Sequence, residues 1–140
     1  VGETHASWGN IRITHVLNSG AAFGLGEKFT VFITIFSMVI ISAVASALWR
    51  TTSNAWATGL ALILGGAFGN LYDRLFRPPA AFSGHVIDFI SVGKFPVFNV
   101  ADSAVTIGVV IVLICLLVGK KLTVSPAAEK TDASSQVSHL

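Results

Sequence analysis

The sequence predicts an all-α polytopic membrane protein with three transmembrane helices and a small β element outside the membrane. Hydrophobic residues make up 53% of its 140 residues, charged residues make up only 11%, and the mean hydropathy is +0.75. A soluble domain carries about 25% charged residues. Three apolar runs each have a length within the range of about 17–25 residues that is typical of membrane-spanning helices. These observations indicate one membrane-embedded domain over residues 1–121, followed by a disordered cytoplasmic tail over residues 122–140.

Residues 1–28 are predicted to lie outside the membrane and against its surface. Apolar and polar residues alternate over residues 11–17, which predicts a half-polar strand. The Asn-Ser-Gly sequence at residues 18–20 is expected to end this strand, because these residue types favour turns. The small, glycine-rich segment of residues 21–26 is typical of a tight turn or a close backbone approach.

The three spans are predicted at residues 29–49, 55–71 and 99–118. The first holds 21 uncharged residues, which extend about 30 Å as a helix. The polar turn between the first two spans is short, so these helices are expected to be antiparallel neighbours. Gly65 and Gly69 are four residues apart with Gly66 beside them, so the second helix has a face without side chains, and another backbone is expected to pack closely on this face.

The loop over residues 74–98 is expected on the opposite side of the membrane from Arg50, together with the N-terminal segment. Two consecutive prolines exclude a continuous helix there. Lysine and arginine are almost equally frequent on the two sides, so their number does not decide the orientation. The short turn at Arg50 and the lysine pair at residues 120–121 favour their side as cytoplasmic.

Charge and cysteine content exclude several function classes. The net charge is +2 and no basic run is long enough to follow a phosphate backbone, so nucleic acid is not an expected partner. Cys115 is the single cysteine, so it cannot form a disulfide within the chain, and it is interpreted as a small buried hydrophobe. His15 and His85 stand too far from further histidines or cysteines to predict a metal site. The chain begins at Val1 without a signal peptide and is interpreted as a fragment.

Isolated acids gather at the ends of the predicted spans. Asn70-x-x-Asp73 ends the second span and Asn99-x-x-Asp102 begins the third, and a spacing of three places each Asn and Asp on one helix face. Asp88 lies in the loop between them. Because consecutive spans share this membrane surface, these side chains are expected to converge there. Two further side chains are expected at the same surface: Arg74 and Asn18.

The helix dipoles separate the roles of these acids. Asp102, in the first turn of a helix, is favoured in its ionised form. Asp73, at a helix end, needs a cation such as Arg74 or Arg77. The hypothesis is that Asp88 and Asp102 share a proton and work as a pair. One takes a proton from water and the other hydrogen-bonds the carbonyl oxygen under attack, while the remaining polar side chains brace the pair.

Less specific interpretations stay open. Asp102 could be only a helix cap, Asp73 with Arg74 only an interfacial ion pair, and Asp88 only a turn acid near the lipid head groups. The alternative function is a small transporter or channel component whose acids carry protons or ions. Such a protein would spread its acids across the depth of the membrane, whereas these acids cluster at one surface.

Four short blocks stand in a fixed order along the chain. They are Asn-Ser-Gly-Ala-Ala-Phe at 18–23, Gly-Gly-Ala-Phe-Gly-Asn-Leu-Tyr-Asp-Arg at 65–74, Gly-His-Val-Ile-Asp-Phe at 84–89 and Phe-Asn-Val-Ala-Asp-Ser at 98–103. In these blocks the sequence resembles the lipoprotein signal peptidases, or signal peptidase II, which are membrane aspartic peptidases of bacteria. One block would be weak support, whereas four in this order are highly specific.

The resemblance implies a function and a set of site residues. It implies removal of the signal peptide from diacylglyceryl-modified prolipoproteins, by cleavage before the lipidated cysteine, near the outer surface of the bacterial inner membrane. It implies no metal or cofactor. The implied catalytic pair is Asp88 and Asp102, and the residues expected to bind substrate or support the pair are Asn18, Gly20, Phe23, Asn70, Asp73, Arg74, Asn99 and Ala101.

The resemblance also implies a fold. Members of the family have four spanning helices and a small extracytoplasmic β cradle in the first loop. Because the present sequence holds three predicted spans, the first helix of the family is expected to be absent. The protein is expected to be a monomer surrounded by membrane lipid.

Overall fold

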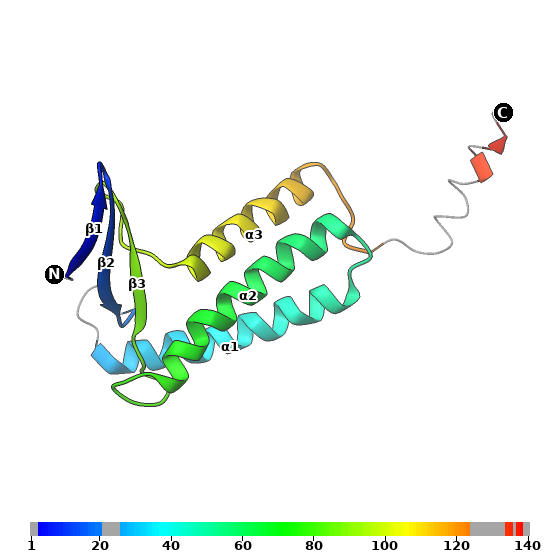
Figure 1. Cartoon of the computed structure of the whole chain (residues 1–140). Coiled ribbons are helices and arrows are strands. Elements are labelled where there is room, and N and C mark those ends of the chain that lie inside the picture. Colours follow the sequence, from blue (N-terminus) through cyan, green and yellow to red (C-terminus); the bar gives the residue numbers. More distant parts are fainter. Residues whose placement is uncertain (1–2, 21–25, 124–133, 136, 139–140) are drawn as a thin grey trace.

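The structure is a computed structural model that describes residues 3–20, 26–123, 134–135 and 137–138. Three helices form an elongated bundle, and a small sheet stands at one end of it (Figure 1). The elements follow in the order β1 (Thr4–Trp8), β2 (Ile11–Asn18), α1 (Gly26–Arg50), α2 (Asn54–Phe76), β3 (Val86–Val92) and α3 (Val100–Leu117).

All three helices are long and apolar enough to cross a membrane, as predicted. α1 and α3 lie close to the predicted spans, but α2 continues through Phe76 instead of ending at residue 71. The amide of Arg77 donates to the carbonyl of Asp73, which completes the last turn, and Pro78 then stops the helix because it has no N–H. The polar residues that were expected to close the span are therefore part of the helix.

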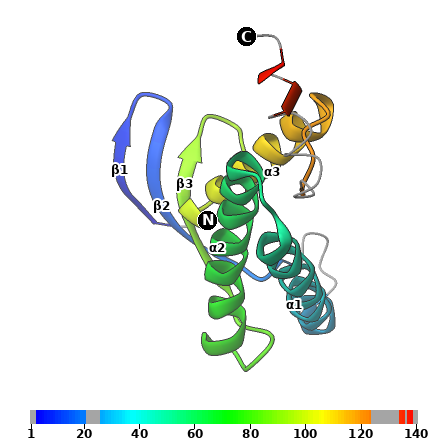
Figure 2. The same ribbon diagram turned by 90° about the vertical axis from the view of Figure 1, so that its right-hand side faces the viewer.

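α2 lies between α1 and α3 (Figure 1) and packs most closely on α3. In the view of Figure 2, β3 of the sheet lies on the other side of α2 from α1 and α3. The two helices meet at glycines. A Cβ on Gly59 would lie 3.1 Å from the backbone oxygen of Gly108, and a Cβ on Gly66 would collide with the backbone oxygen of Ala101. Because these positions carry no side chain, the two backbones can approach each other directly.

The glycine face predicted from Gly65, Gly66 and Gly69 is only partly used in this contact. A Cβ on Gly65 would meet no atom within 4 Å, and one on Gly69 would make an ordinary contact of 3.4 Å with the side chain of Ala101. The close approach is made by Gly66, the third glycine of the predicted face. Gly66 stands seven residues after Gly59, which in a helix places both on the same face.

The sheet is antiparallel with the strand order β1-β2-β3. The strand predicted at residues 11–17 is β2, and Gly9, with a φ of 59°, turns the chain between β1 and β2. β1 was not predicted, and β3 lies in the segment that was predicted as a loop. The pairing of Asn18 with Val86 joins the first loop to the segment before α3, so the sheet is built from both loops.

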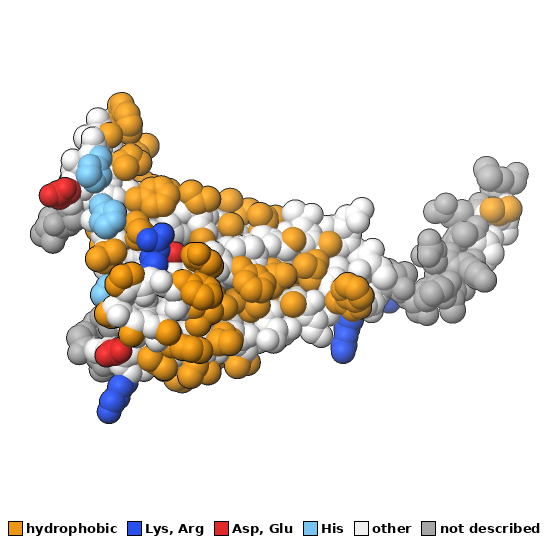
Figure 3. Space-filling view, turned by 60° about the horizontal axis from the view of Figure 1, so that its bottom comes forward, with side chains coloured by type: hydrophobic (Ala, Val, Ile, Leu, Met, Phe, Trp, Pro, Cys, Tyr) orange, Lys and Arg blue, Asp and Glu red, His pale blue; other side chains and the backbone are white. Residues whose placement is uncertain are grey.

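The opposite end of the bundle is closed by a small apolar cluster. Trp56, Leu60 and Cys115 are buried there, which confirms the interpretation of Cys115 as a buried hydrophobe. The indole N–H of Trp56 donates to the carbonyl of Lys120 at 2.8 Å. Elsewhere hydrophobic side chains cover the outside of the helices, and lysine and arginine side chains lie toward the two ends (Figure 3). Lipid solvates a surface with this distribution.

Candidate active site

The loop after α2 folds back over the end of that helix and so directs β3 toward it. The amide of Gly84 donates to the carbonyl of Arg74 at 2.9 Å. A Cβ on Gly84 would collide with the backbone oxygen of Asp73, so this approach requires glycine. β3 starts two residues later and carries Asp88 to the junction between the sheet and the helices.

Asp88 is held by one side chain from the sheet and one from the start of α3. It is only 2% exposed. Asn18 Nδ2 donates to its Oδ2 at 2.8 Å, and Asn99 Nδ2 donates to its Oδ1 at 2.9 Å. Burial, together with the nearby charge of Asp102, raises the pKa of Asp88, and the two amide donors only partly oppose this rise. Asp88 therefore keeps its proton to a higher pH than an exposed aspartate.

Asp102 is fixed in the first turn of α3 by a reciprocal cap. Asn99 Oδ1 accepts from the amide of Asp102 at 2.9 Å, and Asp102 Oδ2 accepts from the amide of Asn99 at 3.0 Å. Asn70 Nδ2 reaches across from α2 and donates to Asp102 Oδ1 at 2.9 Å. Asp102 is therefore the N3 residue of a capping box whose N-cap is Asn99, and it is more than a part of this cap, because its second oxygen is held by another helix.

Two amide side chains connect the two carboxylates. Asn99 Nδ2 donates to Asp88 and also to Asn70 Oδ1, the latter at 3.0 Å. Asn70 in turn donates to Asp102. We call the chain of side chains Asp88, Asn99, Asn70 and Asp102 the amide relay. The two Asn-x-x-Asp sequences do meet at one end of the bundle as predicted, but Asn99 acts as the cap of α3 and does not share a helix face with Asp102.

Arg74 lies within electrostatic range of Asp88 and Asp102. Its Nη1 is buried and has no hydrogen-bond partner in the part of the chain that the structure describes. Gly20, with a φ of 73°, makes room for it, because a Cβ there would lie 3.3 Å from Arg74 Nη2. Asn18 Oδ1 accepts from the amide of Gly20 at 2.7 Å, so one short turn places both residues at the site.

Of the three other predicted residues, two lie at the edge of this arrangement and one lies outside the residues that the structure describes. Asp73 Oδ1 accepts from Arg77 Nε at 2.6 Å, so it is paired with one of its two expected cations. Ala101 touches α2 through the contact of its backbone oxygen with Gly66. Phe23 lies outside the described residues.

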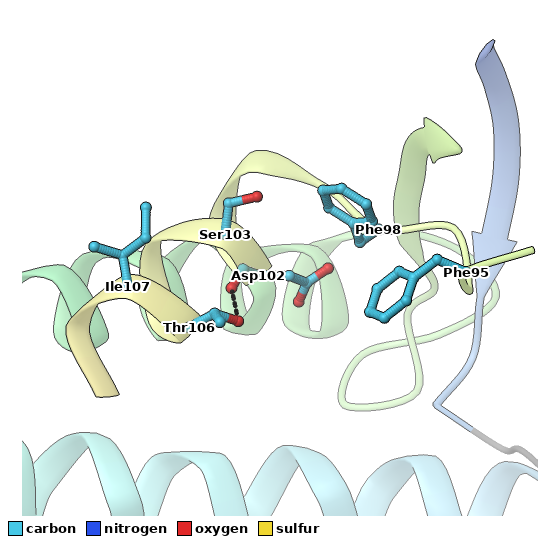
Figure 4. A pocket seen from close by; sticks show the side chains of 6 residues that line it. All are labelled: Phe95, Phe98, Asp102, Ser103, Thr106 and Ile107. Carbon is cyan, nitrogen blue, oxygen red and sulfur yellow. Dashed lines mark hydrogen bonds between the residues drawn. The ribbon is translucent and has the colours of Figure 1, made fainter. Parts of the chain in front are cut away.

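An open groove runs along α3 beside Asp102. Its volume is about 530 Å³, and it is lined by Phe95, Phe98, Asp102, Ser103, Thr106 and Ile107. The rings of Phe95 and Phe98 meet edge to face with centroids 5.9 Å apart, and the Asp102 carboxylate points toward them (Figure 4). The groove therefore joins a carboxylate to an apolar helix surface.

The two carboxylates lie in different environments although both sit at the same end of the bundle. Asp88 is buried and favours its protonated form. Asp102 accepts hydrogen bonds from the Asn70 side chain and from the amide of Asn99 in the first turn of α3. Such a pair can serve as general acid and general base. Among the described residues, no three His, Cys, Asp or Glu side chains are grouped as metal ligands.

Residues 2–118 match the sequence model of the family described as signal peptidase (SPase) II. The chain belongs to the signal peptidase II family. The matched region contains all six helices and strands named above and all four sequence blocks, so the resemblance inferred from those blocks is confirmed.

Curated relatives of this signal peptidase II chain carry the name lipoprotein signal peptidase. The protein of Streptomyces coelicolor is 45% identical over 104 residues, which are 74% of this chain and 51% of that protein. The protein of Mycobacterium tuberculosis (strain H37Rv) is 45% identical over 106 residues, which are 76% of this chain and 52% of that protein. The chain thus spans about half the length of these relatives.

Two solved structures, each described as a bacterial membrane enzyme determined by the in meso method, have the same fold. They superpose with TM-scores of 0.70 and 0.72 at 31% sequence identity. The superposed region covers 84% of this chain and 72% and 76% of those chains. This signal peptidase II member is therefore a multi-pass membrane protein with three helices that can span the membrane and a small antiparallel sheet.

The two roles of Asn99 in this signal peptidase II site, as the N-cap of α3 and as a donor to Asp88, were not predicted from the sequence. A signal for the cap was present, because Asn-x-x-Asp before an apolar run resembles the capping-box pattern. The position of Asp88 on a strand was not predicted either. The Asn18–Asp88 hydrogen bond joins residues 70 positions apart, and no local pattern reports a pairing at that distance.

Proposed function

We propose that this chain forms the catalytic part of an aspartic endopeptidase that removes the signal peptide from diacylglyceryl-modified bacterial prolipoproteins. It cleaves before the lipidated cysteine. The observation that carries the proposal is the amide relay, which joins Asp88 and Asp102 from two different elements at one end of the bundle. Membership in the family and the names of the relatives support the substrate class.

In the proposed reaction Asp102 is the general base and Asp88 the general acid. Asp102 takes a proton from a water molecule that attacks the scissile carbonyl carbon, while the protonated Asp88 hydrogen-bonds the carbonyl oxygen. Asp102 then passes its proton to the leaving amine. The raised pKa of Asp88 and the N–H donors around Asp102 support this division of roles. The remaining residues implied by the resemblance support the pair or the substrate: Asn18, Gly20, Phe23, Asn70, Asp73, Arg74, Asn99 and Ala101.

The groove along α3 is the proposed position of the substrate next to the scissile bond. Phe95 and Phe98 at one end and Ile107 at the other give it apolar walls, and Asp102 also lines it. An apolar segment lying along α3 would thus bring a peptide bond to the carboxylate. We place this site at the extracytoplasmic surface of the bacterial inner membrane, in a protein that acts as a monomer and needs no metal or cofactor.

The test is cleavage of a diacylglyceryl-modified prolipoprotein in detergent or a bilayer. Because the chain spans about half the length of its relatives, it is assayed alone and with the first spanning helix of a relative joined to its N-terminus. The joined protein is expected to cleave before the lipidated cysteine. Asp88→Asn and Asp102→Asn are each expected to lower turnover by about 10²–10⁴-fold, because each removes one member of the acid–base pair.

Glu27→Gln is the matched control. It makes the same chemical change at the same end of the bundle, at an exposed carboxylate that accepts a hydrogen bond from Ser83 at 3.0 Å. This variant is expected to keep its turnover. Turnover retained by Asp88→Asn or Asp102→Asn would contradict the assigned pair. No cleavage by the folded wild-type protein in either form would contradict the substrate class.

A further inference from the structure

The end of the bundle opposite the sheet carries three basic residues. Arg50 ends α1, and Lys120 and Lys121 follow α3. All three are exposed, and none forms an ion pair within the part of the chain that the structure describes. The segments that form this end, residues 41–62 and 109–123, contain neither Asp nor Glu. Figure 3 shows lysine and arginine side chains at this end beside a hydrophobic side chain.

Hydrogen bonds between the turn after α1 and the segment after α3 bring these bases together. Thr51, next to Arg50, donates its hydroxyl to the carbonyl of Leu122 at 2.7 Å. Trp56 donates its indole N–H to the carbonyl of Lys120 at 2.8 Å. Leu122 also packs against the buried cluster that contains Trp56. These contacts therefore hold the segment that carries Lys120 and Lys121 next to the turn that follows Arg50.

Exposed apolar side chains surround this basic cluster. Trp49, directly before Arg50, is 92% exposed, and Leu117, at the end of α3, is 86% exposed. Tryptophan and cations are typical of the boundary where acyl chains give way to head groups. This surface thus places positive charge next to apolar contact area, as the head groups and acyl chains of one lipid leaflet lie next to each other.

We propose that Arg50, Lys120 and Lys121 form a binding site for the head group of an anionic phospholipid. The phosphodiester would contact the bases, and its acyl chains would lie along the exposed apolar surface of α1 and α3. Inorganic phosphate matches only the charge of this surface. The two acids of the C-terminal segment, Glu129 and Asp132, likewise match the charge but not the apolar area. The lipid is the ligand that matches both.

The test measures lipid binding to the full chain in detergent by native mass spectrometry, with phosphatidylglycerol and phosphatidylcholine in competition. The wild-type protein is expected to prefer phosphatidylglycerol. Lys120→Gln with Lys121→Gln is expected to lower this preference about fivefold for each charge removed. Arg12→Gln with Lys28→Gln, which removes two charges at the opposite end, is expected to leave the preference unchanged.

Five results would overturn the proposal. The wild-type protein could bind both lipids equally, or both double variants could lose the preference equally. Millimolar inorganic phosphate could displace the lipid, which would assign the site to a free anion. Phosphatidylglycerol could bind only after Glu129→Gln with Asp132→Gln, which would make the C-terminal segment the occupant. Finally, the lysines could serve only the helix ends, in which case their loss would lower the melting temperature without changing the lipid preference.

Discussion

The side chain of Asn99 has two tasks that depend on different atoms. Its Oδ1 caps α3 by accepting from the amide of Asp102, and its Nδ2 donates to Asp88 and Asn70. A single side chain thus starts the helix and orients the carboxylates. Substitutions that keep one of these atoms and remove the other can separate the two tasks.

Asn99→Ser keeps an oxygen that can cap α3 but has no amide to donate, whereas Asn99→Ala lacks both. We expect both variants to lose turnover by at least about tenfold, because both break the amide relay. We expect Asn99→Ala to be less stable than Asn99→Ser by about 1 kcal/mol, the usual contribution of an N-cap. Thermal unfolding in detergent and the cleavage rate measure the two effects. Wild-type turnover in Asn99→Ser would show that the relay is dispensable.

The buried carboxyl of Asp88 predicts how stability depends on pH. Its pKa is raised in the folded state, so the folded protein binds this proton more tightly than the unfolded chain. The resulting stabilisation is fully present below the unfolded pKa and is lost as the pH rises through the folded pKa. Asp88→Asn removes this titration. Its melting temperature, relative to the wild-type protein, is therefore expected to increase as the pH rises through that window. A difference that does not change with pH would contradict the assignment.

Among the elements, the contact between α2 and α3 sets the position of the site. A Cβ on Gly66 would collide with the backbone oxygen of Ala101, and it would lie 2.7 Å from Val105 Cγ2. Asp102 is the next residue after Ala101. Because the obstacle includes backbone, α3 would have to move as a whole, and Asp102 would move away from Asn70.

Gly66→Ala is therefore expected to lower stability by about 1–3 kcal/mol, the range for an overpacked contact, and to lower turnover as well. Gly65→Ala is the matched control on the same helix, because its Cβ would meet no atom within 4 Å. That variant is expected to be as stable as the wild-type protein or slightly more stable. Thermal unfolding and cleavage assays compare the two. Equal losses in both variants would show that the helix contact is not the cause.

For the whole molecule, the sequence predicts best what short-range patterns control. Apolar runs located all three helices, and residues 29–49 fall entirely within α1. The strand β3 was missed, because most of its residues are apolar on both faces and its partner strand is distant in the sequence. Most residues of the site were named from the isolated acids and the two Asn-x-x-Asp sequences, and Gly20, Phe23 and Ala101 were added from the four blocks. The hydrogen bonds that join them depend on tertiary packing, which is why the amide relay could not be predicted.

The basic residues at one end of the bundle predict how the bundle is oriented across the membrane. The basic end is expected to face the cytoplasm and the sheet the opposite side. In intact cells, a membrane-impermeant thiol reagent is expected to label Ser7→Cys in β1 directly and Thr123→Cys only after permeabilisation. The native Cys115 is 3% exposed and provides the low background. The reverse pattern would contradict the orientation, and labelling of both positions in intact cells would contradict the number of spans.

The cap at the start of α3 also defines how deeply this helix sits in the bilayer. After Asp102 the helix is almost entirely apolar, and such a segment can slide along the membrane normal at little cost. Three hydrogen bonds oppose that movement: Asn70 binds Asp102, and Asn99 binds both Asn70 and Asp88. If α3 sat one residue too deep, these hydrogen bonds and the pairing of the two carboxylates would be lost together. Errors of membrane insertion would therefore separate the two carboxylates and would not carry the intact pair to another depth.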